Sequence, residues 1–291
     1  MALIEETLFG TEDKVALSIQ ALQSFQQPDG YYVAFSGGKD SVVVKALCDM
    51  AGVKYDAHYS VTSVDPPELV QFIKEQYPDV SRDIPRDEDG NAITMWNLIP
   101  KKLMPPTRIV RYCCAVLKET GGYGRMVVTG VRWAESSRRA KNRALVNIGD
   151  TKKSRIMLNN DNDESRHLVE SCFRLKKTTL NPIINWSDEN VWEFIHKYNI
   201  PYCKLYDEGY HRLGCLGCPQ NTAAAADLVK YPTYRRAYIR AFDKMVEERK
   251  KRGLNVEWGG GEEVMEWWLS DRTKTDDPID GQIALELGDE F

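Results

Sequence analysis

The sequence has no run of apolar residues approaching the roughly 18 that a membrane-spanning helix requires. Its first fourteen residues, MALIEETLFGTEDK, are acidic and lack the basic-then-apolar order of a secretory leader. No internal repeat is visible along the 291 residues. We therefore expect a cytoplasmic protein that does not bind a membrane. Apolar residues at 42% and charged residues at 28% are ordinary proportions for a globular protein with a sizeable core.

The sequence also lacks an even set of cysteines. It has seven, and an odd number in a cytoplasmic protein argues against a disulfide framework and favours metal binding or catalysis. Cys48 and Cys172 are predicted to be core cysteines. The 73 residues after Cys218 contain no cysteine.

The net charge is only −4, but the charges are distributed unevenly. Residues 101–155 contain fourteen Lys or Arg and three acids, whereas residues 271–291 contain seven acids and two bases. The basic stretch suits either a polyanion, such as nucleotide phosphates or nucleic acid, or a solvated basic face. We expect the acidic segment to be a solvated tail.

The apolar pattern predicts strands and helices that alternate along the chain. Such alternation is typical of an α/β fold with a mostly parallel, twisted sheet and helices on both faces. The predicted elements are a helix over 12–25 capped by Thr11, a strand over 31–35, a helix over 41–51 closed by Gly52, a strand over 55–61, a helix over 69–76, a helix opened by RYCCAVLK, a strand over 125–131, a loop or hairpin over 150–166, a helix with Ser187 as N-cap and Asn190 at its third position, and a basic helix over 231–251.

We predict four segments: an N-terminal helix in residues 1–30, an α/β domain in 31–219, a helical C-terminal extension in 220–270 and the acidic tail in 271–291. In parallel α/β sheets, ligands bind beyond the carboxyl ends of the strands. The motifs at Ser36, Asp65 and Thr129 each follow a predicted strand directly. We therefore expect these motifs at the ligand-binding edge of the sheet.

The segment SGGKDS separates a predicted strand from a predicted helix. It does not match the Walker A pattern, because Asp40 stands between Lys39 and Ser41, and the G-x-G-x-x-G fingerprint is absent. Its chemistry is nevertheless that of an anion site. A glycine turn exposes backbone N–H groups, and hydroxyls, a cation and a helix dipole converge on it. The residues predicted to form it are Ser36, Gly37, Gly38, Lys39, Asp40 and Ser41.

After an apolar strand, SGGKDS resembles the S-G-G-x-D-S pyrophosphate loop of the PP-loop ATP pyrophosphatase superfamily. The resemblance implies a Rossmann-like, adenine nucleotide alpha-hydrolase-like fold that binds ATP in this loop. It also implies cleavage between the α and β phosphates, with an adenylylated intermediate and release of pyrophosphate. Lys39 would then stabilise the charge on departing pyrophosphate. Asp40 would position Mg²⁺, directly or through water.

Residues 128–139, VTGVRWAESSRR, resemble the strand-then-G-x-R segment of the phosphoadenosine phosphosulfate (PAPS) reductase-like branch of that superfamily. In that branch arginines face the nucleotide phosphates, and a guanidinium suits forked recognition of phosphate oxygens. The resemblance implies nucleotide contacts from Gly130, Arg132, Arg138 and Arg139, and a catalytic role for Arg132. For any single arginine, a solvated basic surface is the alternative.

Asp65 lies in VDPPE, where this branch carries D-T-G-x-x-x-P-E-T after its second strand. The Thr-Gly pair is missing here. Two interpretations of Asp65 remain open: a contact with Mg²⁺ or the ribose, and a carboxylate that caps the following helix.

Four cysteines form two clusters, the adjacent Cys113 and Cys114 and the C-x-x-C pair Cys215 and Cys218. Adjacent cysteines fit one tetrahedral zinc ion awkwardly, because neighbouring side chains diverge. A [4Fe–4S] cluster, which takes one thiolate at each of four separated irons, tolerates that divergence better. The arrangement also resembles the cluster signature of assimilatory sulfonucleotide reductases and of related ATPases of DNA phosphorothioation. We expect a [4Fe–4S] cluster, with zinc, a redox thiol pair or simple buried cysteines as alternatives.

Sulfonucleotide reductases carry a nucleophilic cysteine on a C-terminal tail, and this sequence has none after Cys218. The resemblance therefore favours an ATP-cleaving enzyme that adenylylates an acceptor for sulfur transfer. A cysteine desulfurase is a candidate sulfur donor, and a nucleic acid is a candidate acceptor. One alternative is a PAPS or adenylylsulfate reductase that uses a partner's thiol or Cys203, which is expected near the cluster. Another is a non-catalytic nucleotide- or nucleic-acid-binding module with a structural metal.

Overall fold

The structure, a computed structural model, describes residues 2–7, 10–149, 155–162, 164–165, 169 and 177–270. The predicted acidic tail, Cys172 and the side chain of Arg138 lie outside the described residues. Within the described part of the chain, none of the helices combines the length and the hydropathy that crossing a bilayer requires.

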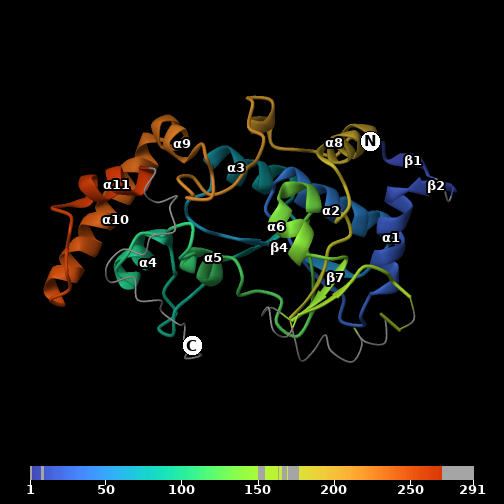
Figure 1. Cartoon of the computed structure of the whole chain (residues 1–291), viewed down its shortest axis with the longest axis horizontal. Coiled ribbons are helices and arrows are strands. Elements are labelled where there is room, and N and C mark those ends of the chain that lie inside the picture. The colour runs from blue at the N-terminus through green and yellow to red at the C-terminus, as the bar shows by residue number, and fades with distance from the viewer. Residues whose placement is uncertain are drawn as a thin grey trace. The chain divides into compact units, whose positions relative to one another are not determined.

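Strands and helices alternate through most of the described chain (Figure 1). The strands are β1 (Ile4–Thr7), β2 (Gly10–Asp13), β3 (Tyr31–Ala34), β4 (Tyr55–Ser60), β5 (Ser81–Asp83), β6 (Met126–Val128), β7 (Val146–Ile148), β8 (Ile156–Leu158) and β9 (Thr178–Leu180). The helices are α1 (Lys14–Ser24), α2 (Lys39–Ala51), α3 (Pro67–Gln76), α4 (Met95–Lys102), α5 (Tyr112–Leu117), α6 (Ser137–Asn142), α8 (Asp188–Lys197), α9 (Ala224–Lys230), α10 (Pro232–Lys251) and α11 (Gly261–Leu269).

The chain divides into two compact units, each assembled from separate stretches of sequence. The first unit comprises residues 1–61, 66–83 and 120–214. The second comprises residues 62–65, 84–119 and 215–291. The chain therefore leaves the first unit three times and returns to it twice.

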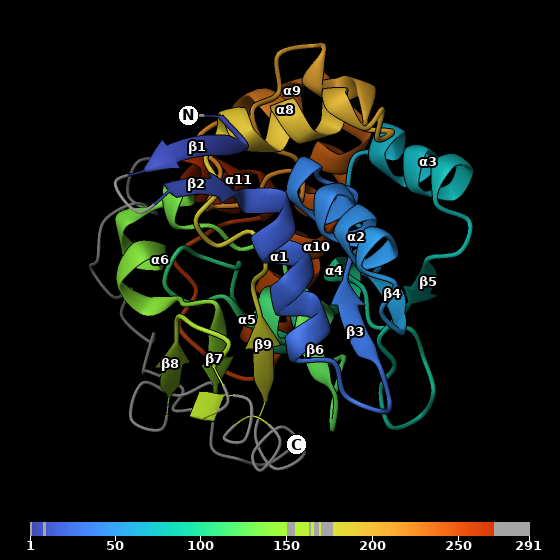
Figure 2. The same cartoon turned by 90° about the vertical axis from the view of Figure 1, so that its right-hand side faces the viewer.

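The first unit contains the central sheet, whose seven described strands follow the order β5-β4-β3-β6-β9-β7-β8 (Figure 2). The strands from β5 to β9 in that order pair in parallel, whereas β7 pairs antiparallel with both β9 and β8. The predicted mostly parallel α/β sheet is confirmed. Its carboxyl edge lies after β3 and β6, where SGGKDS and the G-x-R segment begin.

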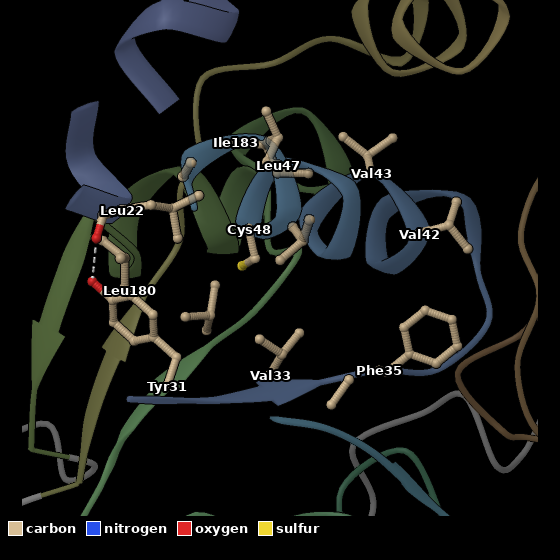
Figure 3. Close-up of a cluster of buried hydrophobic side chains, with 14 of the residues drawn as sticks. Leu22, Tyr31, Val33, Phe35, Val42, Val43, Leu47, Cys48, Leu180 and Ile183 are labelled. Carbon is tan, nitrogen blue, oxygen red and sulfur yellow. Dashed lines mark hydrogen bonds between the residues drawn. The ribbon is translucent and has the colours of Figure 1, made fainter. Parts of the chain in front are cut away.

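Alternating side chains of β3 and the residue after it build the core beneath α2 (Figure 3). Tyr31, Val33 and Phe35 point to the same side of the strand, as the two-residue period of a strand requires. The hydroxyl of Tyr31 donates to the carbonyl of Leu22 in α1 at 2.7 Å. The buried residues of α2 include Val42, Val43, Leu47 and Cys48, of which Cys48 points toward β3 (Figure 3). Cys48 is thus a core cysteine, as predicted, and burial raises the pKa of its thiol to about 12.

The predicted helix near the N-terminus begins later than expected. Asp13 caps α1, because its Oδ1 accepts from the amides of Val15 and Ala16 at 2.9 and 3.0 Å. The prediction that Thr11 is the cap is wrong: Thr11 lies in β2, and its hydroxyl donates to Glu6 across the β1–β2 hairpin. By contrast, the predicted Ser187 cap of α8 is confirmed, since Ser187 accepts from the amide of the third helical residue.

The second unit is a small helical body with its own core. The predicted basic helix is α10, and it packs on α4 and α11 (Figure 1). Its apolar face is buried through Tyr238, Phe242 and Met245, while Lys and Arg occupy much of the remainder. Trp268 of α11 contacts the rings of Tyr238 and Phe242, and its indole donates to the carbonyl of Pro106 at 2.6 Å.

Candidate functional site

The SGGKDS loop, residues 36–41, follows β3 and opens α2. Gly37 has a left-handed backbone with φ of 71°, whereas Gly38 is extended and stands as the N-cap of α2. Because the N-cap residue is a glycine, it has no side chain to cap this end of the helix. The hydroxyl of Ser41 folds back to the carbonyl of Gly38 at 2.8 Å and accepts from Ser36 at 3.3 Å. The loop therefore presents a helix start that has no side chain at its N-cap position and lies next to two hydroxyls, an arrangement that suits anions.

Gly37→Ala should destabilise the fold, whereas Gly38→Ala should not. A Cβ on Gly37 would lie 2.8 Å from the buried side chains of both Leu69 and Ile73, and its positive φ disfavours alanine. We expect a loss of about 1–2 kcal/mol from the backbone and about 1–3 kcal/mol from overpacking. A Cβ on Gly38 would meet nothing closer than Tyr206 Oη at 3.4 Å. Urea unfolding of both variants tests this, and equal stability of the two would contradict the turn geometry.

Two buried cations and two carboxylates meet beside this loop. Lys39 is 6% exposed and Arg132 1% exposed. Arg132 donates from Nε to Asp40 at 2.6 Å and from Nη2 to Asp188 at 2.5 Å. Lys39 Nζ lies 3.7 Å from Asp40 and 3.5 Å from Asp188. Each cation is therefore paired with both carboxylates, which is how a protein keeps charges in a buried position.

The pKa of Asp188 reflects this pairing. Burial alone would raise it, but the Lys39 ammonium and the Arg132 guanidinium outweigh burial and hold the pKa below its usual value. A third bond from Arg132, to the carbonyl of Trp186 at 3.2 Å, fixes the guanidinium plane. The predicted pair Lys39 and Arg132 is thus brought together by the fold, 93 residues apart in sequence.

The G-x-R segment packs directly against the start of α2. A Cβ on Gly130 would lie 3.0 Å from the backbone and Cβ of Asp40, so only glycine permits this approach without a shift. Arg139 lies in the same unit and pairs with Glu135. Burial and the neighbouring guanidiniums of Arg212 and Arg143 lower the pKa of Arg139 to about 10. Positive charge therefore accumulates around Arg139, as a polyanion site requires.

Three contributors to the loop's surroundings were not predicted. They are Asp188, Tyr206 and His211. The amide of Lys39 donates to the Tyr206 hydroxyl at 2.9 Å, and Lys39 Nζ donates to the carbonyl of His211 at 3.4 Å. All three lie within residues 188–211, a segment that starts at α8 and contacts Lys39 of the SGGKDS loop. A sequence pattern offers no signal for such long-range contacts.

Asp65 belongs to the second unit and does not cap a helix. The N-cap of α3 is Pro66, with no side-chain hydrogen bond, so the capping interpretation is wrong. Asp65 is buried and accepts from the Thr62 hydroxyl at 2.7 Å. Its charge contributes to the raised pKa of both Lys118 and Cys215. Asp65 thus lies among the thiols of the second unit.

The four clustered cysteines all belong to the second unit. Cys113 interacts electrostatically with Cys114, Cys215 and Cys218, which places the two clusters in one neighbourhood. Gly217, between Cys215 and Cys218, has φ of 70° and packs against Trp268, so the C-x-x-C turn requires glycine there. In the part of the chain that the structure describes, however, no three His, Cys, Asp or Glu side chains are gathered as ligands for one metal ion.

Cationic side chains surround these thiols. Arg111 Nη2 donates to Cys114 Sγ at 3.3 Å. A hydrogen bond from Cys113, assisted by Arg111 and Lys118 and opposed by burial, lowers the pKa of Cys114 to about 5. The same hydrogen bond and burial raise the pKa of Cys113. Burial, opposed by Lys118, raises the pKa of Cys215 to about 11. The neighbourhood therefore favours a thiolate at Cys114, the form that binds metals.

Comparison with known families identifies the family of this chain. The sequence profile described as the phosphoadenosine phosphosulfate reductase domain matches residues 30–221, which are 192 of the 291 residues. The chain belongs to this family. The predicted PAPS reductase-like branch of the PP-loop superfamily is thereby confirmed, and the matched residues include both SGGKDS and the G-x-R segment.

Relatives of this PAPS reductase family member fall into two groups. Two uncharacterized proteins of Methanocaldococcus jannaschii are 26% and 27% identical, over 76% and 64% of this chain. The aligned part is 48% of the first protein and 35% of the second, so the chain spans at most about half the length of these relatives. The adenosine 5′-phosphosulfate reductase of Bacillus cereus is 23% identical over 71% of this chain and 80% of that protein.

Two solved structures align with the chain. The PAPS reductase of Candida auris, solved as a phosphate complex, has a TM-score of 0.45 and 15% identity over 68% of this chain and 87% of that one. The NMN synthetase of Francisella tularensis has a TM-score of 0.35 and 10% identity over 92% of this chain and 97% of that one.

Proposed function

We propose that this PAPS reductase family member binds ATP at the SGGKDS loop and cleaves it to AMP and pyrophosphate, adenylylating an acceptor for sulfur transfer. One observation carries the proposal: two buried cations, Lys39 and Arg132, meet at the glycine-capped start of α2. Helix dipole, backbone N–H groups and fixed positive charge thus act on the same place. Ser36, Gly37, Gly38, Ser41 and Gly130 complete the nucleotide-binding residues we propose.

The chemistry required of these residues is electrostatic. An acceptor oxygen forms a bond to the α phosphorus, the bond to the α,β-bridging oxygen breaks, and pyrophosphate leaves with the electron pair. Lys39 and Arg132 would stabilise the charge that develops on the leaving group. Arg139 would extend positive charge along the polyphosphate, and Arg138 is proposed with it from the family resemblance.

The motif predicts that Asp40 positions Mg²⁺, and the contacts of Asp40 suggest a second role. Its carboxylate is engaged by Arg132 Nε and lies near Lys39 Nζ, and Asp188 is engaged by the same two cations. The described carboxylates at the loop therefore do not form a magnesium site by themselves. We propose that Asp40 orients Arg132 and Lys39, and that Mg²⁺ arrives as the counter-ion of the nucleotide phosphates.

We further propose that Cys113, Cys114, Cys215 and Cys218 hold a [4Fe–4S] cluster. Support comes from the donor set, which is all sulfur, from the shared neighbourhood of the two clusters and from the adjacent cations Arg111 and Lys118. A bound cluster would supply either an electron-transfer centre or a sulfur-binding iron. Zinc is the alternative metal for the same four thiols.

Sulfur donor and acceptor are proposed from chemistry. A persulfide, as made by a cysteine desulfurase, would attack the adenylylated atom and displace AMP. The basic residues of 101–155 would suit a nucleic acid as the acceptor. A pyrophosphate-release assay with ATP across candidate acceptors, including DNA and tRNA, tests the proposal. Acceptor-dependent pyrophosphate supports it, whereas ATP binding without any pyrophosphate release would favour a non-catalytic binding module.

A sulfonucleotide reductase is the second candidate, favoured by the named reductase relatives. It needs a thiol that attacks the sulfate sulfur, and Cys203 cannot supply it as folded. Cys203 is 0% exposed, and burial raises the pKa of its thiol. A partner's thiol would have to serve. Release of labelled sulfite from PAPS or adenylylsulfate would decide for this candidate.

Cys203 should resist alkylation in the native protein. Its thiol is protonated and enclosed in the core of the first unit, whereas iodoacetamide requires an accessible thiolate. We expect no Cys203 adduct in native protein and complete modification in denaturant, measured by peptide mass spectrometry. Rapid native labelling of Cys203 would reinstate it as a candidate nucleophile.

A further inference from the structure

Asp188 forms ion pairs with Lys39 and Arg132, the two cations that we propose bind phosphate. The proposed function does not require these ion pairs. Arg132 Nη2 lies 2.5 Å and Lys39 Nζ 3.5 Å from the same oxygen, Oδ1 of Asp188. Together with Asp40, this makes two cations and two carboxylates, whose formal charges cancel. An incoming phosphate group would therefore meet two cations whose charges are already neutralised by carboxylates.

The two carboxylates differ in how firmly they are held. Asp40 has a side chain 24% exposed and lies next to Gly130, where an added Cβ would be 3.0 Å from the Cβ of Asp40. Asp188 has a side chain 62% exposed and is the first residue of α8. Rotating Asp188 into water restores its hydration, whereas the side chain of Asp40 is the more enclosed of the two. Asp188 is thus the carboxylate that can leave at low cost.

We propose that Asp188 is a stand-in anion, which holds Lys39 and Arg132 in place without ligand and yields them to the nucleotide's phosphates. This inference rests on the proposed function, because it assumes that the SGGKDS loop binds polyphosphate. Buried cations without a counter-charge are costly, so the ligand-free protein needs Asp188. The same carboxylate competes with the ligand, so it lowers affinity for pyrophosphate and favours product release. Asp188 is therefore a positioning residue for the two cations.

The test is titration calorimetry with inorganic pyrophosphate on wild type, Asp188→Asn and Glu189→Gln. Glu189→Gln is the matched control, because it removes the same charge from the same helix start. The hydrogen bonds of the Glu189 side chain are with Ser187 and with its own backbone. Removing the competitor should tighten pyrophosphate binding by at least about tenfold in Asp188→Asn. Glu189→Gln should bind as wild type does.

The unfolding temperatures of wild type and Asp188→Asn, measured with and without pyrophosphate, give a second test. Without ligand, Asp188→Asn should unfold at a lower temperature than wild type, because two buried cations lose a counter-charge. With saturating pyrophosphate the two should unfold at nearly the same temperature. A purely structural role for Asp188 would leave the difference unchanged when pyrophosphate is bound.

Three outcomes separate this inference from the proposed function. Tighter binding by Asp188→Asn supports the stand-in role. If Asp188→Asn binds pyrophosphate as tightly as wild type or more weakly, the stand-in role is overturned but the phosphate site remains in place. No binding by any of the proteins overturns both. Should Asp188→Asn fail to fold, a crystal structure of wild type with pyrophosphate decides: loss of the Asp188–Arg132 pair supports the proposal, and its persistence overturns it.

Discussion

Lys39→Ala should lower pyrophosphate release from ATP by about a hundredfold to a thousandfold, the usual effect of removing one preorganised donor from a developing anion. Its ammonium is buried at the start of α2 and held by Asp40, Asp188 and the carbonyl of His211. The fold should survive, because Arg132 still pairs with both carboxylates. Steady-state pyrophosphate release with saturating ATP measures the effect.

Lys45→Ala is the matched control for this variant. Lys45 lies on the same helix with its side chain 9% exposed, and pairs with Asp49 and Asp79. Its loss should cost stability without reducing turnover, because none of these partners is part of the SGGKDS loop. Wild-type turnover in a well-folded Lys39→Ala protein would contradict the role given to this lysine.

Cys215→Ala should abolish the bound cluster. Anaerobically purified wild type should be brown, contain about four irons and four sulfides per chain, and show the broad visible absorption of thiolate-to-iron charge transfer. Cys215 is a half-buried residue of the second unit, with its thiol 3.7 Å from the Thr62 hydroxyl and interacting with Lys118. Removing one of four ligands from such a site should leave little iron bound. Iron and sulfide analysis with an absorption spectrum measures it.

Cys48→Ala controls for the loss of any buried cysteine. Cys48 is fully buried in the core of the first unit, whereas the four clustered cysteines belong to the second unit. The Cys48→Ala protein should retain iron at the wild-type level. Stoichiometric zinc without iron in anaerobic wild type would eliminate the cluster assignment and favour the zinc alternative.

Much of the fold could be predicted from local pattern. The β3–α2 and β4–α3 units and the capped start of α8 each depend on contacts between residues near in sequence. The cap of α1 was misplaced because Thr11 and Asp13 are both good N-caps, and only the β1–β2 hairpin selects Asp13. The division into two discontinuous units could not be predicted from the sequence. A stretch as short as residues 62–65 is too small for its composition to show which unit it belongs to.

The candidate site divides in the same way. Lys39, Asp40 and Arg132 lie in short motifs and could be predicted. Asp188 could not, because its pairing with Lys39 joins positions 149 residues apart, and Tyr206 reaches the amide of Lys39 over 167 residues. Asp65 has a motif-like context, yet the chain places it beside Cys215 and Lys118.

The central claim is that the SGGKDS loop binds the triphosphate of ATP. A crystal structure of the protein with a non-hydrolysable ATP analogue tests it most directly. We expect the β and γ phosphates to accept hydrogen bonds from backbone N–H groups of residues 37–41 and to lie within hydrogen-bond distance of Lys39 and Arg132. Phosphate density elsewhere, with the loop unoccupied at saturating analogue, would contradict it.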